Sequence, residues 1–242
     1  MNPGYTQDTL LNGKLRIRQP GKGYRFSVDA LLLAQFANVK AGEHILELGA
    51  GCGVISLMLA FQNPDIRITA IEIQPELAEL ARHNIAANGL EKRMQVLCQD
   101  LRKLSLHHFA CPVDRVIANP PFRKKESGRI NPHLQQAIAR HEISVTIQDM
   151  IHATSRLLRK GGRFDVIYCT ERLSELLCEM SSAQIEPKSM QFVHGNGGLP
   201  ARMVLVSGVK GSRPGGLMVC PPLLLKGAAF RDSPTADEGP AP

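Results

Sequence analysis

Residues 47–54 of the chain read Glu-Leu-Gly-Ala-Gly-Cys-Gly-Val, and this stretch decides the fold. It continues from a short apolar run, His44–Leu48, and leads into a longer one, Val54–Phe61, which suits a buried helix. Its three glycines allow a tight turn between a strand and a helix, and they let a ligand approach the backbone closely. The stretch therefore predicts the first strand, turn and helix of an open α/β sheet, which binds ligands at the carboxyl ends of its strands.

The rest of the chain alternates strand and helix patterns. We expect strands at Arg67–Ile73, Met94–Cys98, Val113–Ala118 and Arg163–Cys169, and helices at Pro75–Asn88, Asp149–Arg159 and Glu171–Met180. Repeated β-α-β units imply parallel strands with helices on both faces. The last two apolar runs, Met190–His194 and Arg202–Val209, are joined by a loop too short for a crossover helix, which predicts an antiparallel hairpin. The predicted fold is a doubly wound α/β sheet of seven strands, mostly parallel.

Length and composition exclude several classes of protein. The 242 residues have room for one domain, and no apolar run is long enough to span a membrane. The first 18 residues lack the apolar region of a secretory signal. The six cysteines form no C-x-x-C pair, which argues against a zinc site and a disulfide framework. We therefore expect a protein of the cytoplasm with reduced thiols and no metal.

The glycines of the turn, Gly49, Gly51 and Gly53, distinguish between cofactor classes. A nicotinamide-binding turn has the pattern G-x-G-x-x-G, whose third glycine follows the second by three residues. Here position 54 is Val and the third glycine is at 53, so the spacing fits a pyrophosphate-binding turn poorly. The alternative is that the glycines only shape a turn.

Two acids end the next two strands. Glu72 lies roughly 20 residues after the turn, where a carboxylate accepts the ribose hydroxyls of a nucleoside. The alternative for Glu72 is an acid placed before the helix that starts at Pro75, where the helix dipole stabilises it. Asp100 ends the third strand in a similar way, and its alternative is a simple loop acid.

The stretch Asn119-Pro120-Pro121-Phe122 follows the fourth strand and is the most specific signal in the chain. Its two prolines fix the backbone and remove two donors. A planar amine, as on adenine, guanine or a carboxamide, can donate its two hydrogens to Asn119 and the Pro120 carbonyl while Phe122 stacks on it. The nitrogen lone pair then faces an incoming methyl group, and positioning supplies the catalysis without a general base. The alternative is a proline-stiffened strand exit with a buried Phe.

These residues carry a resemblance to a known family. The turn at 47–53 resembles the first motif of class I S-adenosylmethionine-dependent methyltransferases, and with Glu72, Asp100 and the Asn-Pro-Pro-Phe stretch the chain looks like enzymes that methylate exocyclic amines and amides. Residues 23–34 (GYRFSVDALLLA), together with SGRINP and ARHE after the Asn-Pro-Pro-Phe stretch, look like the bacterial adenine-N6 methyltransferases of the valine tRNA anticodon loop. The likeness covers the chain up to about residue 226.

The resemblance implies a Rossmann-like fold, S-adenosylmethionine as the methyl donor and an RNA, expected to be tRNA, as the substrate. In the family, the segment with Phe26, Ser27 and Asp29 closes over the methionine end of the cofactor, and Asp100 contacts the adenine amine. Asp29 equally suits a helix N-cap. The implied catalytic residues are Asn119, Pro120, Pro121 and Phe122. The implied cofactor-binding residues are Phe26, Ser27, Asp29, Glu47, Gly49, Gly51, Gly53, Glu72, Ile73, Asp100, Leu101 and Asn119.

Positive charge is concentrated in two stretches. One comprises Lys14, Arg16, Arg18, Lys22 and Arg25, and the other comprises Arg123, Lys124, Lys125 and Arg129. The second follows the Asn-Pro-Pro-Phe stretch directly, so we expect it to contact substrate RNA around a flipped-out base. The alternative for both is a solvated charged surface. His141 and Glu142 suit a helix cap, and we assign them no chemistry.

The expected organisation is a basic N-terminal flap at residues 1–40 packed on a methyltransferase domain at 41–226. The proline-rich end at 227–242 is expected to be a disordered tail. The tail is acidic, so the net charge of +7 becomes +9 without it. A basic body permits a nucleic-acid partner. With no room for a separate RNA-binding domain, the catalytic domain itself is expected to hold the RNA.

Other functions remain open at this point. Phe122 in place of Tyr also occurs in guanine-N2 methyltransferases of ribosomal RNA, and a protein glutamine is a third amine substrate. A non-catalytic RNA-binding module with the same fold is a further alternative, because fold does not fix function. Such a module would be free to lose the glycine turn or the Asn-Pro-Pro-Phe stretch, and both are intact.

Overall fold

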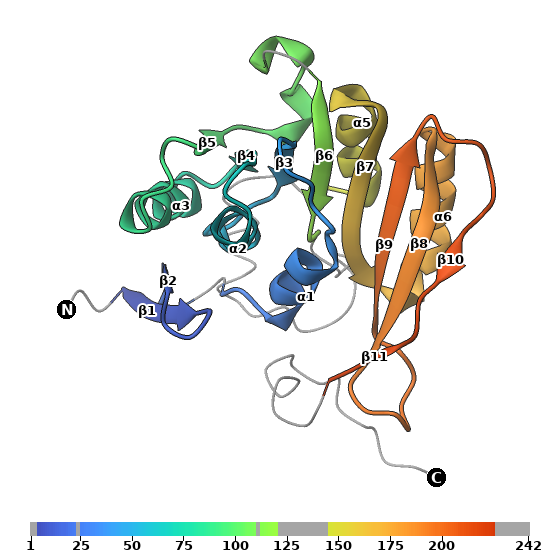
Figure 1. Ribbon diagram of the computed structural model, residues 1–242, viewed down its shortest axis with the longest axis horizontal. Coiled ribbons are helices and arrows are strands. Elements are labelled where there is room, and N and C mark those ends of the chain that lie inside the picture. Colours follow the sequence, from blue (N-terminus) through green and yellow to red (C-terminus); the bar gives the residue numbers. More distant parts are fainter. Residues whose placement is uncertain (1–3, 23–24, 110–111, 121–144, 226–242) are drawn as a thin grey trace.

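The computed structural model describes residues 4–22, 25–109, 112–120 and 145–225, and its centre is a twisted sheet (Figure 1). Within those residues the sheet has nine strands in the order β10-β8-β9-β7-β6-β3-β4-β5, and β11 also pairs with β8. The strands are β3 (His44–Leu48), β4 (Arg67–Glu72), β5 (Met94–Cys98), β6 (Val113–Ala118), β7 (Leu158–Cys169), β8 (Ile185–His194), β9 (Met203–Lys210), β10 (Met218–Val219) and β11 (Leu223–Leu224). The order places β3 between β4 and β6.

The strand directions confirm the predicted fold. Strands β5, β4, β3, β6 and β7 are parallel, and β9 is antiparallel to both β7 and β8. The C-terminal hairpin is therefore formed by β8 and β9, as expected. The short strands β10 and β11 were not expected, because two-residue strands carry no periodic signal. They pair in parallel with the edge of β8.

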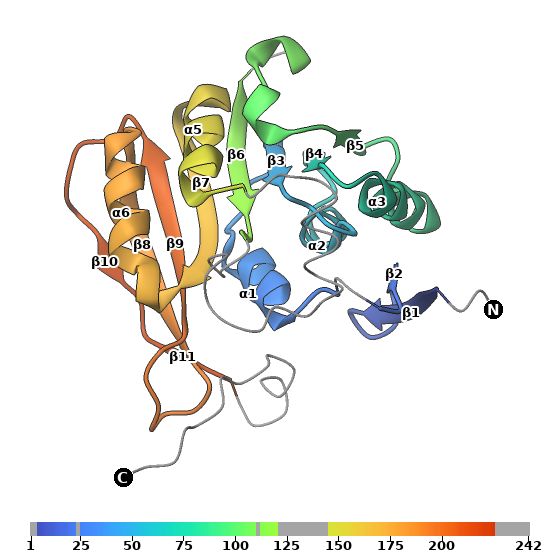
Figure 2. The same cartoon turned by 180° about the vertical axis from the view of Figure 1, so that it is seen from behind.

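Helices cover both faces of the sheet, so the hydrophobic core has two parts (Figures 1 and 2). One part involves α1 (Val28–Phe36), α2 (Val54–Gln62) and α3 (Pro75–Ala87), and the other involves α5 (Ile147–Leu157) and α6 (Leu173–Ser182). Short 3-10 helices complete the described elements: η1 (Leu101–Lys103), η2 (Leu106–His108) and η3 (Thr170–Arg172). None of the helices in this part of the chain has the length and apolar character that crossing a bilayer requires.

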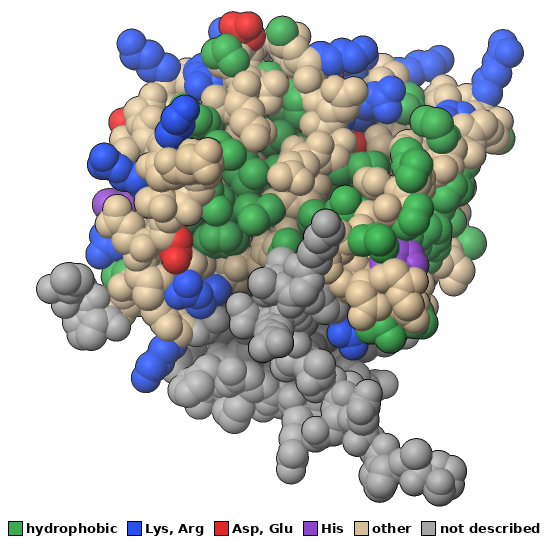
Figure 3. Space-filling model, turned by 60° about the horizontal axis from the view of Figure 1, so that its bottom comes forward, with side chains coloured by type: hydrophobic (Ala, Val, Ile, Leu, Met, Phe, Trp, Pro, Cys, Tyr) green, Lys and Arg blue, Asp and Glu red, His purple; other side chains and the backbone are tan. Residues whose placement is uncertain are grey.

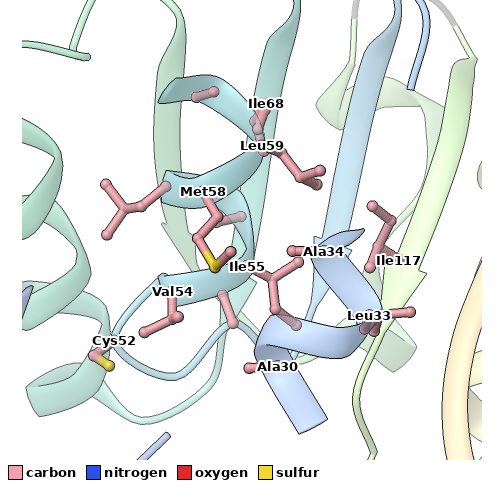
Figure 4. Packing of buried hydrophobic residues seen from close by; sticks show 14 of the residues in the cluster. Ala30, Leu33, Ala34, Cys52, Val54, Ile55, Met58, Leu59, Ile68 and Ile117 are labelled. Carbon is pink, nitrogen blue, oxygen red and sulfur yellow. The ribbon is translucent and has the colours of Figure 1, made fainter. Parts of the chain in front are cut away.

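Helix α1 packs closely on α2 (Figure 4). Ala30 and Ala34 are small, and both are buried near Ile55 of α2. Leu33 is fully buried beside Ile117 of β6. The N-terminal part of the chain is thus joined to the sheet by apolar packing.

An N-terminal hairpin, β1 (Tyr5–Leu10) and β2 (Leu15–Pro20), forms a separate two-stranded sheet. Sequence reasoning assigned no strand here. The alternation along β2 is nevertheless clear, because Leu15 and Ile17 are fully buried and Arg16 between them is exposed. The hairpin packs against α2 and α3. The N-terminal flap at residues 1–40 stays a prediction.

The boundary between α5 and β7 differs from the prediction. The helix was expected to extend to Arg159 and the strand to begin at Arg163, but α5 ends at Leu157 and β7 begins at Leu158, so that Gly161 and Gly162 lie inside the strand. The register with β6 shifts at this point. A Cβ on Gly162 would lie 2.9 Å from the carbonyl oxygen of Asp114, so glycine permits the close approach of the two strands.

A buried ion-pair network ties the connection before β3 to the sheet. Arg115 of β6 is 1% exposed. Its guanidinium donates to Glu43 (Nε to Oε2, 2.7 Å), to the Asn38 carbonyl (2.8 Å) and to Asp165 of β7. Such a network costs desolvation, and it is favourable only while every member is paired.

We expect Arg115→Met to lower the free energy of unfolding by about 3–5 kcal/mol, because Asp165 would be left as a buried carboxylate without its cation. Urea titration measures this quantity. The matched control is Arg159→Met, which removes a half-exposed ion pair with Asp114 and should cost no more than about 1 kcal/mol. Equal losses in the two variants would contradict a special role for the buried network.

Candidate active site

Strand register brings three of the predicted residues to one edge of the sheet. Leu48 of β3 pairs with Ile71 of β4 and with Ala118 of β6. The next residues, Gly49, Glu72 and Asn119, therefore follow at the same level on three adjacent strands. This is the carboxyl edge of the parallel strands, where open α/β sheets bind ligands.

The glycine turn has the backbone conformation that its sequence predicts. The φ angles of Gly49, Gly51 and Gly53 are 71°, 58° and 85°, all in the left-handed region that side chains with a Cβ rarely enter. The carbonyl of Ile71 accepts hydrogen bonds from the backbone N–H groups of Gly49 and Ala50, both at 2.9 Å. The turn is therefore held against β4 while it enters α2.

Glu47 is 2% exposed and caps helix α2. Its Oε2 accepts a hydrogen bond from the backbone N–H of Ser56 (3.0 Å) and another from the Ser56 hydroxyl. Burial raises the pKa of the Glu47 carboxyl to about 7, the bonds from Ser56 oppose this shift, and the neighbouring charge of Glu72 adds to it. The Glu47 carboxyl, from β3, thus lies against the first turn of α2.

Glu72 holds the same turn from the other side. Its Oε2 accepts from the Gly51 backbone N–H at 2.7 Å, and its Oε1 accepts from the Gln74 backbone N–H at 2.9 Å. The side chain is 5% exposed, at the end of β4. These two bonds fix the position of the Glu72 carboxylate at the carboxyl edge of the sheet.

Glu47 and Glu72 determine which cofactors this turn can hold. Pyrophosphate-binding turns offer free backbone N–H groups and a positive helix N-terminus to the phosphates. Here the N–H groups of Gly51 and Ser56 donate to carboxyl groups and are not offered to a phosphate, and the Glu72 carboxylate would repel one. The turn therefore disfavours a pyrophosphate, and the charge of Glu72 favours a cofactor that carries positive charge.

The Cys52 thiol lies in the glycine turn and is a poor nucleophile. Burial raises the pKa of the Cys52 thiol to about 12, so its thiolate is scarce at neutral pH. In the described part of the chain, no group of three or more His, Cys, Asp and Glu side chains is arranged to hold a metal ion.

Asp100 has partners of its own. Its side chain accepts from the backbone N–H of Arg102 at 2.9 Å, which caps the 3-10 helix η1, and it pairs with the Arg102 guanidinium (Oδ2 to Nη2, 2.7 Å). The hydrogen bonds from the Arg102 side chain hold the pKa of Asp100 below its ordinary value. These contacts fit the loop-acid interpretation, and contact with an adenine amine stays a prediction. Leu101 beside it is buried, and Ile73 is half-buried.

The segment that is expected to close over the cofactor lies at the start of α1. Ser27 is the N-cap of the helix, and Asp29 is in its first turn rather than at the cap itself. Burial raises the pKa of Asp29, and a hydrogen bond with Ser27 opposes the shift. Phe26 donates its backbone N–H to Oε1 of the buried Gln19 of β2 at 3.2 Å, which links this segment to the hairpin.

The structure describes the first half of the Asn-Pro-Pro-Phe stretch. Asn119 is half-buried and Pro120 is buried directly after β6. The remaining predicted residues lie outside the described residues: Pro121, Phe122, Arg123, Lys124, Lys125, Arg129, His141 and Glu142.

Sequence reasoning missed two residues that shape the turn. Ser56 holds Glu47, and Asn84 of α3, which is 1% exposed, donates its side-chain amide to the Cys52 carbonyl at 3.0 Å. Nothing in the sequence marked Ser56. Asn84 had a detectable signal, because it is a polar residue on the apolar face of α3 with Leu77, Leu80 and Ala81.

Comparison with known proteins identifies the family. Residues 27–181 match the methyltransferase small domain. The chain belongs to the methyltransferase small domain family. Among solved structures, that of a predicted O-methyltransferase from Agrobacterium tumefaciens shares the fold, with a TM-score of 0.65 and 24% identity over 84% of this chain and 92% of that one. The family confirms the expected methyltransferase class.

Two curated relatives of this methyltransferase carry the same name, "tRNA1(Val) (adenine(37)-N6)-methyltransferase". The one from Porphyromonas gingivalis W83 is 36% identical over 66% of this chain and 64% of its own length. The one from Flavobacteriaceae bacterium strain 3519-10 is 30% identical over 73% of this chain and 79% of its own length. The predicted resemblance to this group is confirmed.

The pKa of Glu47 gives a test of the turn in this methyltransferase. Between its ordinary value of 4.5 and about 7, Glu47 is protonated only in the folded state, so the free energy of unfolding falls as the pH rises through this window. We expect the wild type to lose about 3 kcal/mol more than Glu47→Gln between pH 4.5 and pH 8. Urea titrations at several pH values measure the difference. Parallel pH curves would show that Glu47 is not buried as described.

Proposed function

We propose that the chain transfers a methyl group from S-adenosylmethionine to the N6 amine of an adenine in RNA, most specifically in tRNA. The observation that carries this proposal is the glycine turn closed by Glu47 and Glu72, which lies level with Asn119 at the carboxyl edge of the sheet. The names of the curated relatives support the adenine N6 position and the tRNA substrate.

The residues at the turn fit this cofactor, which supplies an electrophilic methyl group on a positively charged sulfur and contains no phosphate. Glu72, held at the end of β4 by backbone bonds to Gly51 and Gln74, would accept the ribose hydroxyls. Gly49, Gly51 and Gly53 would let the cofactor approach the backbone, and Glu47 would hold the turn through Ser56. The further proposed cofactor contacts are Phe26, Ser27, Asp29, Ile73, Asp100, Leu101 and Asn119.

The proposed transfer depends on positioning. Asn119 and the Pro120 carbonyl would accept the two hydrogens of the adenine amine and aim its lone pair at the methyl group. The nitrogen–methyl bond forms as the sulfur–methyl bond breaks, and the nitrogen then loses one proton. Pro121 and Phe122 would complete this pocket, with the ring of Phe122 stacked on the base. An extruded adenine is needed because the amine is not accessible to the site within a duplex.

The partner and setting belong to the same proposal. Arg123, Lys124, Lys125 and Arg129 would contact phosphates around the extruded base. Residues 1–40 would form the flap, 41–226 the methyltransferase domain and 227–242 the tail. We place the enzyme in the cytoplasm, where tRNA is modified and where unpaired thiols such as those of Cys52 and Cys98 persist.

Product analysis tests the proposed reaction. The protein is incubated with labelled S-adenosylmethionine and total RNA from a strain that lacks the gene, and nucleosides from the separated RNA fractions are identified. Labelled N6-methyladenosine in the tRNA fraction is the expected result. Labelled N2-methylguanosine, label in protein glutamine, or no label in any fraction would each contradict the proposal.

We expect Asn119→Ala to lower kcat by about 100-fold or more, because the amine would no longer be held in line with the methyl group. Single-turnover methylation of tRNA measures the loss, and calorimetry with S-adenosylhomocysteine checks the cofactor site. The dissociation constant for that cofactor product should stay within about threefold of the wild type. A large loss of cofactor binding with normal turnover at saturation would show that the role of Asn119 is wrongly assigned.

Glu72→Gln should weaken S-adenosylhomocysteine binding by about 10- to 100-fold, because a hydrogen bond to a carboxylate becomes a bond to a neutral amide. The isosteric side chain still offers one acceptor to Gly51 or Gln74, and the unfolding midpoint provides the control for a preserved fold. Unchanged binding would remove Glu72 from the cofactor site.

A further inference from the structure

We propose that the outward face of the β1–β2 hairpin is an RNA-docking surface that grips the phosphate backbone away from the modified base. This inference rests on the proposed function and adds a second contact region to it. Its residues are Tyr5, Gln7, Thr9, Arg16 and Arg18, which share one face of the hairpin, with Lys14 in the turn and Lys22 after β2.

The hairpin register separates two faces with opposite character. Arg18 lies opposite Gln7, and Arg16 lies opposite Thr9, so these side chains share one face. The other face carries Leu15, Ile17 and Gln19, which are 0%, 0% and 2% exposed. The strand register therefore determines that the outward face is polar and basic, because a shift of the β2 register by one residue would bury the arginines.

Acidic charge is directed away from this face. Asp8 is the one acid in the described part of the hairpin, and it lies opposite Ile17 on the inner face. Its carboxylate accepts from the Gln19 amide and pairs with Arg25 at 3.4 Å. The basic residues of the outward face thus meet no carboxylate of their own hairpin, which leaves their charge for a polyanion.

Arg18 is held in a geometry that suits a nucleic acid. Its guanidinium carbon lies 4.5 Å from the centre of the Tyr5 ring, so the guanidinium is stacked on the aromatic face. Stacking leaves the guanidinium edge, with its N–H donors, free to meet phosphate oxygens. Gln7 and Thr9 on the same face add neutral donors of the kind that contact phosphate and sugar.

Helix α3 fixes the hairpin in place through two asparagines. Asn84 and Asn88 each pair with the backbone of β2: their side-chain oxygens accept from Arg18 and Arg16 (2.8 and 2.9 Å), and their amides donate back to the same residues (2.8 and 2.7 Å). Residues i and i+4 of a helix rise about 6 Å, which approaches the roughly 6.7 Å between residues i and i+2 of a strand. The two arginines are therefore held by a rigid element.

The same contacts connect the surface to the active site. Asn84 also donates to the Cys52 carbonyl in the glycine turn. The hairpin lies at the end of the sheet where β6 ends (Figures 1 and 2). Figure 3 shows Lys and Arg side chains along the left margin of the molecule, the side on which Figure 1 places the hairpin, and others along its upper edge. An RNA whose base enters the site can thus extend its backbone over the hairpin.

The test compares two double variants that remove equal charge. Arg16→Gln with Arg18→Gln changes the outward face, and Arg67→Gln with Lys92→Gln changes exposed residues at the amino ends of β4 and β5, the opposite edge of the sheet. Fluorescence anisotropy measures the dissociation constant for unmodified tRNA at several salt concentrations. This measurement does not depend on methylation. If the wild type binds tRNA but methylates no RNA, the proposed function fails while the docking surface can still be tested.

We expect the hairpin variant to bind tRNA at least about tenfold more weakly near 0.1 M salt. The slope of log affinity against log salt concentration should be less steep than that of the wild type by about 1–2. The control variant should stay within about twofold of the wild type. S-adenosylhomocysteine affinity should be unchanged in both. Equal losses of tRNA affinity in the two variants, or an unchanged tRNA affinity in the hairpin variant, would overturn the inference. The inference would also fail if the hairpin variant lost binding to phosphatidylglycerol vesicles while its tRNA affinity stayed unchanged, because the face would then bind a lipid surface.

Discussion

The hydrogen bond from the Gly51 backbone N–H to the Glu72 carboxylate is the interaction on which the candidate site depends. It joins the turn after β3 to the end of β4, and Glu47 continues the arrangement by capping α2 at Ser56. Because carboxyl groups take up these N–H donors, the turn loses the anion-binding character that helix N-termini usually have. In this sheet architecture, the turn thus disfavours a phosphate and favours a cofactor that carries positive charge.

The surrounding contacts keep this turn in register with the rest of the molecule. The buried Arg115 network secures the connection into β3 from the far end of the sheet, through Glu43 and Asn38. On the near side, Asn84 bonds both to the turn and to β2. Asn84 of α3 therefore connects the glycine turn to the basic hairpin, and the proposed RNA surface and the cofactor turn share this rigid element.

Sequence reasoning predicted the parts that depend on local pattern. The strands His44–Leu48, Met94–Cys98 and Val113–Ala118 have the expected bounds, and the glycine turn has the expected left-handed angles. It did not predict what depends on contacts between distant residues. The hairpin β1–β2 is stabilised by Asn84 and Asn88, more than sixty residues away in the chain, and Gly162 is required by the approach of Asp114 rather than by a helix end. The placement of Glu72 and Asn119 at one edge of the sheet could be predicted from strand order, whereas the pairing of Asp100 with Arg102 could not.

The central claim is that the acidic glycine turn selects a phosphate-free, positively charged nucleoside cofactor. Calorimetric titration of the full chain with S-adenosylmethionine and, separately, with NAD tests it most directly. The account predicts saturable binding of S-adenosylmethionine at one site and no detectable binding of NAD at the same concentrations. Binding of NAD with equal or greater affinity, or no binding of S-adenosylmethionine, would contradict it.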